Sequence, residues 1–260
     1  MRSSIFITGA AAGIGRATAE LFASRGWFVG LYDINESGVQ ALRQQLGDAN
    51  TVAGRLDVTD ATAFERALAQ FWDAAGQRLD VLFNNAGIAA VGAFEDSPLP
   101  KYNAVIDVNL KGVVNGFYKA LPYLKQTPGA RAISMCSASA IYGAPDFAVY
   151  SATKFAVRGL SEALDLEWRR HGITVRDLMP LFVDTPMVAR FEVKPKSFDV
   201  MGLHLSASDL AHAVWRAAHW PRWLPKVHFY PGVQTWLTAL AQKLSPTWLN
   251  RFTSRLITGH

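Results

Sequence analysis

The sequence predicts an α/β fold: one doubly wound parallel sheet of about seven strands with helices on both faces, in a single domain. Short runs rich in β-branched and apolar residues alternate with longer stretches of helical periodicity. The length of 260 residues, half of them apolar, suffices for one sizeable core but not for a second domain of ordinary size. A glycine-rich turn directly after the first apolar run completes the pattern.

Seven apolar runs are the predicted strands. They cover residues 4–8, 27–32, 51–56, 79–83, 131–135, 173–178 and 226–229. Helical stretches separate successive runs, so each connection is a crossover and the strands are expected to be parallel. In such a sheet, ligands bind at the carboxyl ends of the strands. Neither an internal repeat nor a low-complexity linker interrupts the alternation.

The turn after the first predicted strand has the layout of a phosphate-binding loop. Gly9, Gly13 and Gly15 lie between the run 4–8 and a helical pattern. Glycines let the backbone approach a ligand, and a helix N-terminus offers free N–H groups to an anion. The second strand ends near Asp33, where a dinucleotide site places a carboxylate against the adenosine ribose. Alone, Asp33 could equally be a loop acid or a helix cap, but its place behind the turn favours a Rossmann-type ribose site.

Tyr150 and Lys154 lie four residues apart, and Ser137 precedes Tyr150 by thirteen residues. On a helix, residues at i and i+4 share one face, so the Lys154 ammonium is expected beside the Tyr150 phenol. A cation within ~4–6 Å favours the phenolate and lowers the pKa of the phenol from its ordinary ~10. A tyrosine of that kind can exchange a proton near neutral pH. Taken alone, the pair could be an ordinary amphipathic helix with an exposed lysine.

Four motifs occurring in this order resemble those of the short-chain dehydrogenase/reductase family, from about Ser4 to Met187. The matching residues are Thr8, Gly9, Gly13, Ile14 and Gly15 of the family's glycine turn, Asp57 and Val58 after the third strand, Asn84, Asn85, Ala86 and Gly87 after the fourth, and the tetrad Asn109, Ser137, Tyr150 and Lys154. The resemblance implies an NAD(P)-dependent enzyme that acts on an alcohol or a ketone. It also places Asp57 and Val58 near the adenine.

The same resemblance implies a role for each residue of the tetrad. Tyr150 is expected to take the alcohol proton in oxidation or to protonate the forming alkoxide in reduction. Lys154 is expected to lower the pKa of Tyr150 and to bind the nicotinamide ribose, while Ser137 holds the substrate oxygen. Asn109 is expected to hold a water that links Lys154 to solvent, although it could instead be a helix asparagine bonded to a bent backbone.

Charge near Asp33 favours NAD over NADP as the cofactor. A carboxylate accepts hydrogen bonds from ribose hydroxyls but repels a 2′-phosphate, which calls for a nearby cation. Position 12 is alanine and position 34 is isoleucine, so two places where related enzymes put a cation lack one. Arg16 and Arg55 are the cations that could still reach the phosphate of NADP.

One segment departs from the family pattern. Related chains have glycine after the proline that follows the sixth strand, whereas here Leu181 follows Pro180. Because leucine lacks the freedom of glycine at positive φ, the local backbone is expected to differ. Pro180, Val183 and Thr185 are still expected near the nicotinamide by resemblance.

The substrate is only weakly indicated by the sequence. Residues 186–205 occupy the position of the family's substrate loop, and its apolar side chains suggest a lid over a hydrophobic alcohol or ketone. The lid residues are Met187, Phe191, Phe198 and Met201, with Phe94 and Phe147 as walls. These side chains could also simply fill a core.

The C-terminal residues differ in charge from the rest of the chain. The net charge is +5, yet residues 210–260 hold six basic and no acidic residues, together with five of the eight tryptophans. We therefore divide the chain into a catalytic domain, 1–231, and an amphipathic helical extension, 232–260, in which Ser245 and Pro246 separate two helices. The extension is expected to cover a neighbouring subunit of a homodimer or homotetramer, and an anionic membrane surface is the alternative.

Several classes of function are disfavoured by the same sequence. No apolar stretch reaches the ~18–20 residues of a membrane span, and the glycine turn would be lost if the N-terminus were a cleaved signal. The single cysteine, Cys136, excludes an internal disulfide and fits a cytoplasmic location. Neither a metal site nor a nucleic-acid motif is indicated. Two alternatives remain open: a dinucleotide-binding sensor or scaffold, and an NADPH-dependent carbonyl or oxoacyl reductase.

Overall fold

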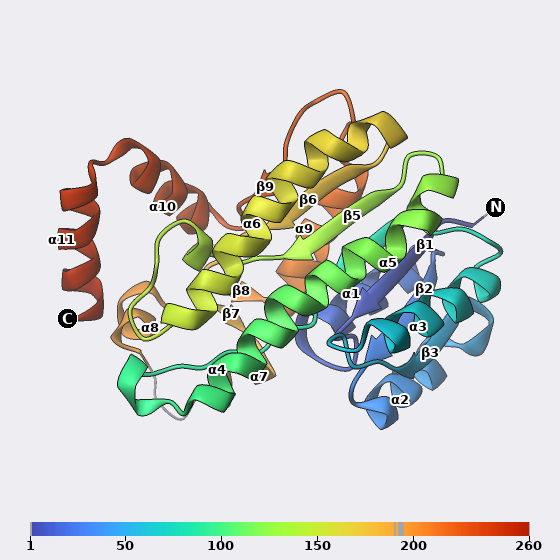
Figure 1. The fold of residues 1–260 in the computed structure, drawn as a ribbon, viewed down its shortest axis with the longest axis horizontal. Coiled ribbons are helices and arrows are strands. Elements are labelled where there is room, and N and C mark those ends of the chain that lie inside the picture. The colour runs from blue at the N-terminus through green and yellow to red at the C-terminus, as the bar shows by residue number, and fades with distance from the viewer. Residues whose placement is uncertain (1, 190, 192–194, 260) are drawn as a thin grey trace.

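The computed structural model describes residues 2–189, 191 and 195–259, and within them a seven-stranded sheet lies between two layers of helices (Figure 1). The strand order is β3-β2-β1-β4-β5-β6-β9, and all of these pairings are parallel. The strands are β1 Ser4–Thr8, β2 Phe28–Asp33, β3 Thr51–Arg55, β4 Val81–Asn84, β5 Arg131–Met135, β6 Thr174–Leu178 and β9 His228–Phe229. All seven expected strands are present, and each differs from its predicted bounds by at most two residues at either end.

Helices cover both faces of the sheet. The principal helices are α1 Gly13–Ser24, α2 Glu36–Leu46, α3 Ala61–Ala74, α4 Leu99–Ile106, α5 Gly112–Gln126, α6 Ala148–Trp168 and α9 Ala207–His219. Helices α1, α2 and α9 pack on one face, and α3, α5 and α6 pack on the other. Because the strand order reverses direction between β1 and β4, the loops after these two strands diverge and leave a crevice for a ligand.

The core is built from interlocking aromatic rings. Phe6 of β1 stacks on Tyr32 of β2 at 4.4 Å between ring centroids, and its other neighbours are Phe64 and Phe71 of α3. Gly30 makes this possible, since a Cβ there would lie 2.5 Å from a ring carbon of Phe71. Burial of such large rings is a main source of stability in a domain of this size.

Smaller elements connect β6 to the C-terminus. They are β7 Val183–Asp184, α7 Pro186–Ala189, α8 Lys196–Met201 and β8 Leu205–Ser206. Strands β7 and β8 pair in parallel as a separate two-stranded sheet. Residues 190 and 192–194 of the predicted substrate loop lie outside the described residues.

Two further helices, α10 Val233–Leu244 and α11 Thr247–Thr258, project from one end of the molecule (Figure 1). Only Thr235 of α10 and α11 is buried, and α11 lies beside α8. The break between the helices falls at Ser245 and Pro246 as predicted, but Pro246 is the N-cap of α11 and Ser245 ends α10. No side chain therefore caps α11.

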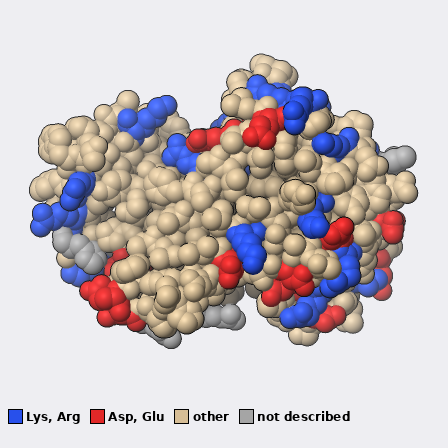
Figure 2. All heavy atoms as spheres, viewed as in Figure 1, with Lys and Arg blue, Asp and Glu red and all other residues tan. Residues whose placement is uncertain are grey.

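The tryptophans of the C-terminal residues divide into two groups. Trp215 packs against Phe22 and Trp27, and Trp220 packs against Phe229, so both belong to the body of the domain. By contrast, Trp223, Trp236 and Trp248 are exposed. Figure 2 shows a surface with few charged residues over α5 and α6, where Val114, Tyr118 and Phe155 are exposed.

Candidate active site

The glycine turn after β1 is closed too tightly for side chains. Gly9 and Gly13 have φ values of +69° and +54°, in the left-handed region that glycine adopts readily. A Cβ on Gly15 would lie 2.0 Å from the carbonyl oxygen of Gly9. Helix α1 begins at this turn behind Ala12, which supplies no side-chain cap. The first N–H groups of α1 are thus available to an anion.

Residues after β4 hold this turn in place. The Asn85 amide donates to the carbonyl oxygens of Thr8 and Gly9, at 2.9 and 3.1 Å. The Thr8 hydroxyl in turn accepts the N–H groups of Asn85 and Ala86, at 3.0 and 3.1 Å. Four residues that the sequence assigned to the cofactor are thereby joined in one hydrogen-bonded unit, in which Asn85 and Thr8 shape the turn.

Asp33 lies at the carboxyl end of β2 with both carboxylate oxygens oriented by backbone. Its Oδ2 accepts the N–H of Ala11 at 3.0 Å, and its Oδ1 accepts the N–H of Asn35 at 2.9 Å. The carboxylate is therefore fixed beside the glycine turn, at the place expected for a ribose partner. The strand register puts the exposed Arg55 of β3 opposite Asp33, whereas Arg16 is bound to Glu20 and Gln45.

Asp57 and Val58 form the turn after β3. The Asp57 carboxylate accepts the N–H and the hydroxyl of Thr59, at 3.0 and 2.8 Å. Val58 is buried against Gly112 at the start of α5, where a Cβ would lie 2.6 Å from a Val58 methyl carbon. Both residues are thus set by local contacts at the carboxyl edge of the sheet.

Ser137 lies close enough to Tyr150 for its hydroxyl to influence the phenol. Ser137 follows β5 in extended backbone and its hydroxyl accepts the N–H of Ser139 at 3.2 Å. Tyr150 lies in the first turn of α6 and is partly buried. Burial raises the pKa of Tyr150 to about 12, although the Ser137 hydroxyl opposes the rise.

This direction corrects the expectation that Lys154 lowers the pKa of Tyr150. The Lys154 ammonium lies 5.4 Å from the centre of the Tyr150 ring and donates to the carbonyl oxygen of Met135 at 2.8 Å. Lys154 is 4 % exposed, and burial lowers its own pKa. The carbonyl of Met135 thus holds the ammonium beneath the ring rather than at the phenolic oxygen, and desolvation decides the pKa of the phenol.

Asn109 is fully buried in a π-helical turn, Asp107–Lys111, between α4 and α5. Its side chain makes a paired contact with the backbone of Ile88, accepting the N–H at 2.9 Å and donating to the carbonyl at 2.8 Å. A Cβ on Gly87 would lie 3.2 Å from the Asn109 amide oxygen and 3.8 Å from the Lys154 ammonium. Asn109 and Lys154 therefore converge on Gly87, and Asn109 bonds to a neighbouring loop rather than to its own helix.

The segment after β6 returns to the glycine turn. The carbonyl of Pro180 accepts the N–H of Ala138 at 2.8 Å, which ties this segment to the loop of Ser137. Val183 is buried, and the methyl group of Thr185 lies 3.6 Å from where a Cβ of Gly13 would be. Thr185 and Gly13 are far apart in sequence, yet the fold brings them together.

Leu181 does not adopt the positive φ that glycine would allow at this position. Its N–H donates instead to the hydroxyl of Thr235, the buried residue of α10, at 3.3 Å. No local pattern in the chain predicts this contact between the loop and the extension.

Aromatic side chains gather beside Tyr150. The ring centroid of Phe147 lies 6.0 Å from Tyr150, 6.3 Å from Phe182 and 6.0 Å from Phe191. Phe198 completes the group at 3.8 Å from Phe182 and 6.0 Å from Phe191. We call Phe147, Phe182, Phe191 and Phe198 the phenylalanine cluster.

The membership of this cluster partly differs from the expected lid and walls. Phe147, Phe191 and Phe198 were expected near the substrate, and Phe182 was missed. Phe94 lies outside this cluster: it is 62 % exposed and stacks on Tyr102, which belongs to a small core group against which Tyr150 packs. Met187 is exposed, and the carbonyl of Met201 binds Gln234 of α10.

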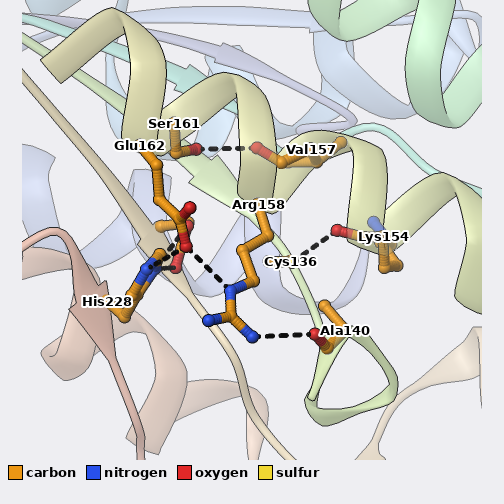
Figure 3. Close-up of polar contacts among 9 residues, drawn as sticks. Cys136, Ala140, Lys154, Val157, Arg158, Ser161, Glu162 and His228 are labelled. Carbon is orange, nitrogen blue, oxygen red and sulfur yellow. Dashed lines mark hydrogen bonds and ion pairs between the residues drawn. The ribbon is translucent and has the colours of Figure 1, made fainter. Parts of the chain in front are cut away.

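A polar network fixes the part of α6 that follows Lys154 (Figure 3). Arg158 donates to the carbonyl of Ala140 at 3.2 Å and to Glu162 at 2.9 Å. His228 of β9 lies between Glu162 and the buried Asp177 of β6, with a ring nitrogen 2.9 Å from each carboxylate. Burial alone would lower the pKa of His228, but the two carboxylates raise it. The sequence analysis did not predict this network. Its signal in the sequence is the charged pair Arg176 and Asp177 inside an apolar strand, of which Asp177 belongs to the network.

Cys136 is a buried thiol without reactive character. Its sulfur donates to the carbonyl of Lys154 at 3.2 Å, and burial raises its pKa to about 12. The thiolate that a nucleophile requires is therefore disfavoured.

The residues at the carboxyl edge fit a nicotinamide dinucleotide. The glycine turn and the uncapped start of α1 suit a pyrophosphate, and Asp33 suits a ribose. A Rossmann-type sheet with this arrangement at the switch between β1 and β4 defines the class of NAD(P)-dependent oxidoreductases.

Comparison with known proteins identifies the family within this class. The model of the short chain dehydrogenase family matches residues 3–196. The chain is 37 % identical over 187 residues to 2,5-dichloro-2,5-cyclohexadiene-1,4-diol dehydrogenase LinX of Sphingobium indicum, covering 70 % of this chain and 74 % of that protein. It is 33 % identical over 195 residues to 3-oxoacyl-[acyl-carrier-protein] reductase FabG of Thermotoga maritima, covering 73 % and 78 %. The chain belongs to the short-chain dehydrogenase/reductase family.

Solved structures agree with this assignment. A short chain dehydrogenase/reductase from Burkholderia phymatum in complex with NAD has a TM-score of 0.81 and 27 % identity, with 92 % of each chain covered. An alcohol dehydrogenase from the archaeon Thermococcus sibiricus, complexed with 5-hydroxy-NADP, has a TM-score of 0.78 and 26 % identity, covering 88 % of this chain and 96 % of that one. Family members of this fold therefore bind either form of the cofactor.

The protein is thus an NAD(P)-dependent dehydrogenase or reductase of this family, and its family binds small-molecule substrates. Membership favours an enzyme over a sensor or scaffold. Within the described residues, no helix is long and apolar enough to cross a bilayer.

Proposed function

We propose that the enzyme transfers a hydride between NAD and a hydrophobic alcohol or ketone, with Tyr150 as the general acid and base. The observation that carries this proposal is the placement of the Ser137 hydroxyl beside the Tyr150 phenol, next to Phe147 of the phenylalanine cluster. A substrate oxygen placed between these two hydroxyls would have one donor to orient it and one group to exchange its proton. When bound, the nicotinamide ring accepts or supplies the hydride.

The direction of proton movement follows from the state of Tyr150. With a raised pKa, Tyr150 is a neutral phenol at pH 7 and can donate its proton to an alkoxide that forms during ketone reduction. In alcohol oxidation the phenolate must form first and then takes the alcohol proton. Ser137 stays neutral throughout, since its hydroxyl both donates and accepts. Lys154 supplies positive charge beneath the ring, and Asn109 is proposed to hold the water that connects Lys154 to solvent.

The substrate side of the site favours an apolar molecule. The phenylalanine cluster has four rings, of which Phe147 lies beside Tyr150, and stacked or edge contacts with such rings suit flat or bulky hydrocarbon groups. Relatives named for a chlorinated cyclohexadiene diol and for an oxoacyl chain are both consistent with an apolar substrate. A carbonyl or oxoacyl reductase using NADPH is the second candidate, and Arg55 opposite Asp33 is the observation in its favour.

Replacing Tyr150 by phenylalanine tests the proposal. The Tyr150→Phe variant keeps the ring and loses the hydroxyl, so turnover should fall by roughly 10²–10⁴-fold or more while the affinity for NAD stays within about twofold. Steady-state rates on a panel of apolar alcohols and ketones, and NAD titration by fluorescence, measure the two quantities. Tyr118→Phe, at an exposed tyrosine of α5, is the control and should turn over normally. Wild-type rates in Tyr150→Phe would refute the role of Tyr150.

We further propose that α10 and α11 cover a second copy of the chain. Their large apolar side chains are exposed over two successive helices: Trp236, Leu237, Leu244, Trp248, Phe252 and Leu256. An exposed apolar surface of this extent is typical of an interface. The basic residues Lys243, Arg251 and Arg255 also suit an anionic membrane, which is the competing occupant.

Light scattering on the full chain and on a variant that ends after Ser245 distinguishes the two occupants. A subunit contact predicts an oligomer that the truncation weakens, with no binding to vesicles. Co-sedimentation with anionic vesicles at low salt by the full chain alone would assign the surface to a membrane and overturn the subunit contact.

A further inference from the structure

A cavity of about 130 Å³ opens at the end of the sheet opposite the active site. It lies between the C-terminal end of α6, the start of β6 and the segment that joins α9 to β9. Its charged residues are Asp165 near the end of α6, Arg169 directly after α6, Arg176 of β6, and Arg222 and Lys226 of the connecting segment. We call these five residues with their cavity the cationic cavity. Because β6 runs from this cavity toward Pro180, the dinucleotide site is separate from it.

Positive charge in the cationic cavity is not balanced by the protein. Four cationic side chains face a single carboxylate, Asp165. That carboxylate is already bound to Arg169 at 3.1 Å and accepts the N–H of Val175 at 3.1 Å. Throughout the described parts of the chain, no ion pair includes Arg176, Arg222 or Lys226.

Arg176 is the most unusual member because it is only 2 % exposed. Its two terminal nitrogens donate to the backbone carbonyls of Ala217 and Trp220, and its Nε has no hydrogen-bond partner. Burial together with the nearby charges of Arg131 and Arg222 lowers the pKa of Arg176 to about 10, although Asp165 opposes this shift. Carbonyl dipoles hold the guanidinium in place but supply no net negative charge, and an unpaired buried charge is costly.

Arg131, the first residue of β5, adds to the same imbalance. Its Nε is also buried without a partner, and burial and the charge of Arg222 lower its pKa. Arg222 lies over Gly129 and Gly172, and one of its nitrogens donates to the carbonyl of Gly172 at 2.6 Å. One contact leaves most of the five donors of an arginine unused. Arg222 and Lys226 are exposed, so a ligand can reach them from solvent.

We propose that the cationic cavity binds a phosphate group, either inorganic phosphate or a phosphate monoester. A guanidinium presents paired donors that match the oxygens of a phosphate, and a lysine adds a point charge. The volume of about 130 Å³ exceeds the ~10–15 Å³ that one water requires, so a compact polyatomic anion fits. Binding would supply the negative charge that the buried Arg176 lacks.

Calorimetric titration of the full chain with inorganic phosphate at constant ionic strength, with and without saturating NAD, tests the proposal. We expect saturable binding that persists with NAD and that becomes roughly tenfold weaker in Arg222→Gln and in Lys226→Gln, as the loss of one charge-assisted hydrogen bond implies. Lys243→Gln on α10 removes one cation elsewhere and should bind as the wild type does. No saturable binding, binding abolished by NAD, or equal affinity in Arg222→Gln would overturn the proposal.

Two sources of the phosphate group are then separated with vesicles. Co-sedimentation with phosphatidic acid in phosphatidylcholine, competed by free phosphate and lost in Arg222→Gln, would assign a lipid headgroup. Phosphate binding without vesicle binding would assign a soluble ligand. Thermal unfolding of each variant in phosphate-free buffer confirms that it is folded. Because Arg222 and Lys226 are both exposed, neither substitution should unfold the protein. If one variant still fails to fold, the other alone suffices for the test.

Discussion

The glycine turn and the phenylalanine cluster are both placed at the carboxyl end of the sheet, yet different kinds of contact hold them. Backbone groups build the turn: Gly9, Asn85 and Thr8 are joined through carbonyl oxygens and N–H groups. Side-chain rings build the cluster, and they come from segments that follow β5 and β6. A region fixed by backbone geometry tolerates almost no added atom, whereas a region of packed rings can change shape and specificity at smaller cost.

Among the substitutions that compare these two regions, the largest effect is expected in the glycine turn. In Gly15→Ala the new methyl group would lie 2.0 Å from the carbonyl oxygen of Gly9. Relieving this overlap requires a backbone shift worth ~1–3 kcal/mol, so NAD affinity should fall about tenfold to over a hundredfold. Fluorescence titration with NAD measures the loss.

Gly159→Ala is the matched control, because a Cβ there meets nothing within 4 Å and the residue lies inside α6. Its free energy of unfolding should rise by ~0.5–1 kcal/mol. Unchanged NAD affinity in Gly15→Ala would show that the turn is looser than its backbone contacts indicate.

Tyr150 lies beside Phe147 of the phenylalanine cluster. Its raised pKa predicts different pH profiles for the two directions of reaction. Oxidation requires the phenolate, so kcat/KM for an alcohol should rise by up to about tenfold per pH unit between pH 7 and 10, below the pKa of about 12. Reduction uses the phenol and should stay nearly constant over that range. Initial rates in both directions give these profiles. An oxidation rate that levels off below pH 9 would mean that Lys154, and not burial, controls the phenol in the working complex.

Asp33 is expected to govern cofactor choice on the nucleotide side. Asp33→Ala removes the carboxylate that would bind the ribose and repel a 2′-phosphate, and it leaves Arg55 opposite the vacated position. The ratio of kcat/KM for NADP to that for NAD should increase by roughly tenfold or more, equivalent to about 1.4 kcal/mol. The same ratio in Asp57→Ala serves for comparison. A wild type that already prefers NADPH would contradict this assignment.

The smallest effect is expected from the phenylalanine cluster. Phe198→Ala should reduce kcat/KM for bulky apolar alcohols several-fold to tenfold and change it little for a short alcohol, because only the larger molecule loses a ring contact. Phe94→Ala, at an exposed ring outside the cluster, is the control. Equal losses for bulky and short alcohols would indicate that Phe198 supports the loop rather than the substrate.

The same contrast explains how far the sequence could predict the molecule. Strands, their parallel order and the glycine turn follow from local signals: apolar runs, spacing, and glycines that only a close backbone approach requires. By resemblance Thr185 is placed near the nicotinamide, which stays a prediction, and its closeness to Gly13 is seen only in the structure. The fold was therefore predictable wherever one short segment determines its own geometry.

Contacts between distant segments were less accessible. The pKa of Tyr150 depends on burial by surrounding elements and on Lys154 being held by the carbonyl of Met135, and neither follows from an i, i+4 spacing. The packing partners of Phe182 and Phe94 were likewise not predictable from the local sequence. Both are aromatic residues in loops, but only the tertiary packing reveals that Phe182 stacks on Phe198 while Phe94 lies against Tyr102.

The hydrogen bond from Leu181 to Thr235 links the loop that precedes Val183 and Thr185 to the first turn of α10. Leu181 lies two residues before β7. A second copy docked on the projecting helices, as proposed, would therefore act on the backbone of this loop, and the proposed assembly and the proposed active site would be coupled there. Shortening the chain before Thr235 would report on both at once, so the extension is best dissected from its far end.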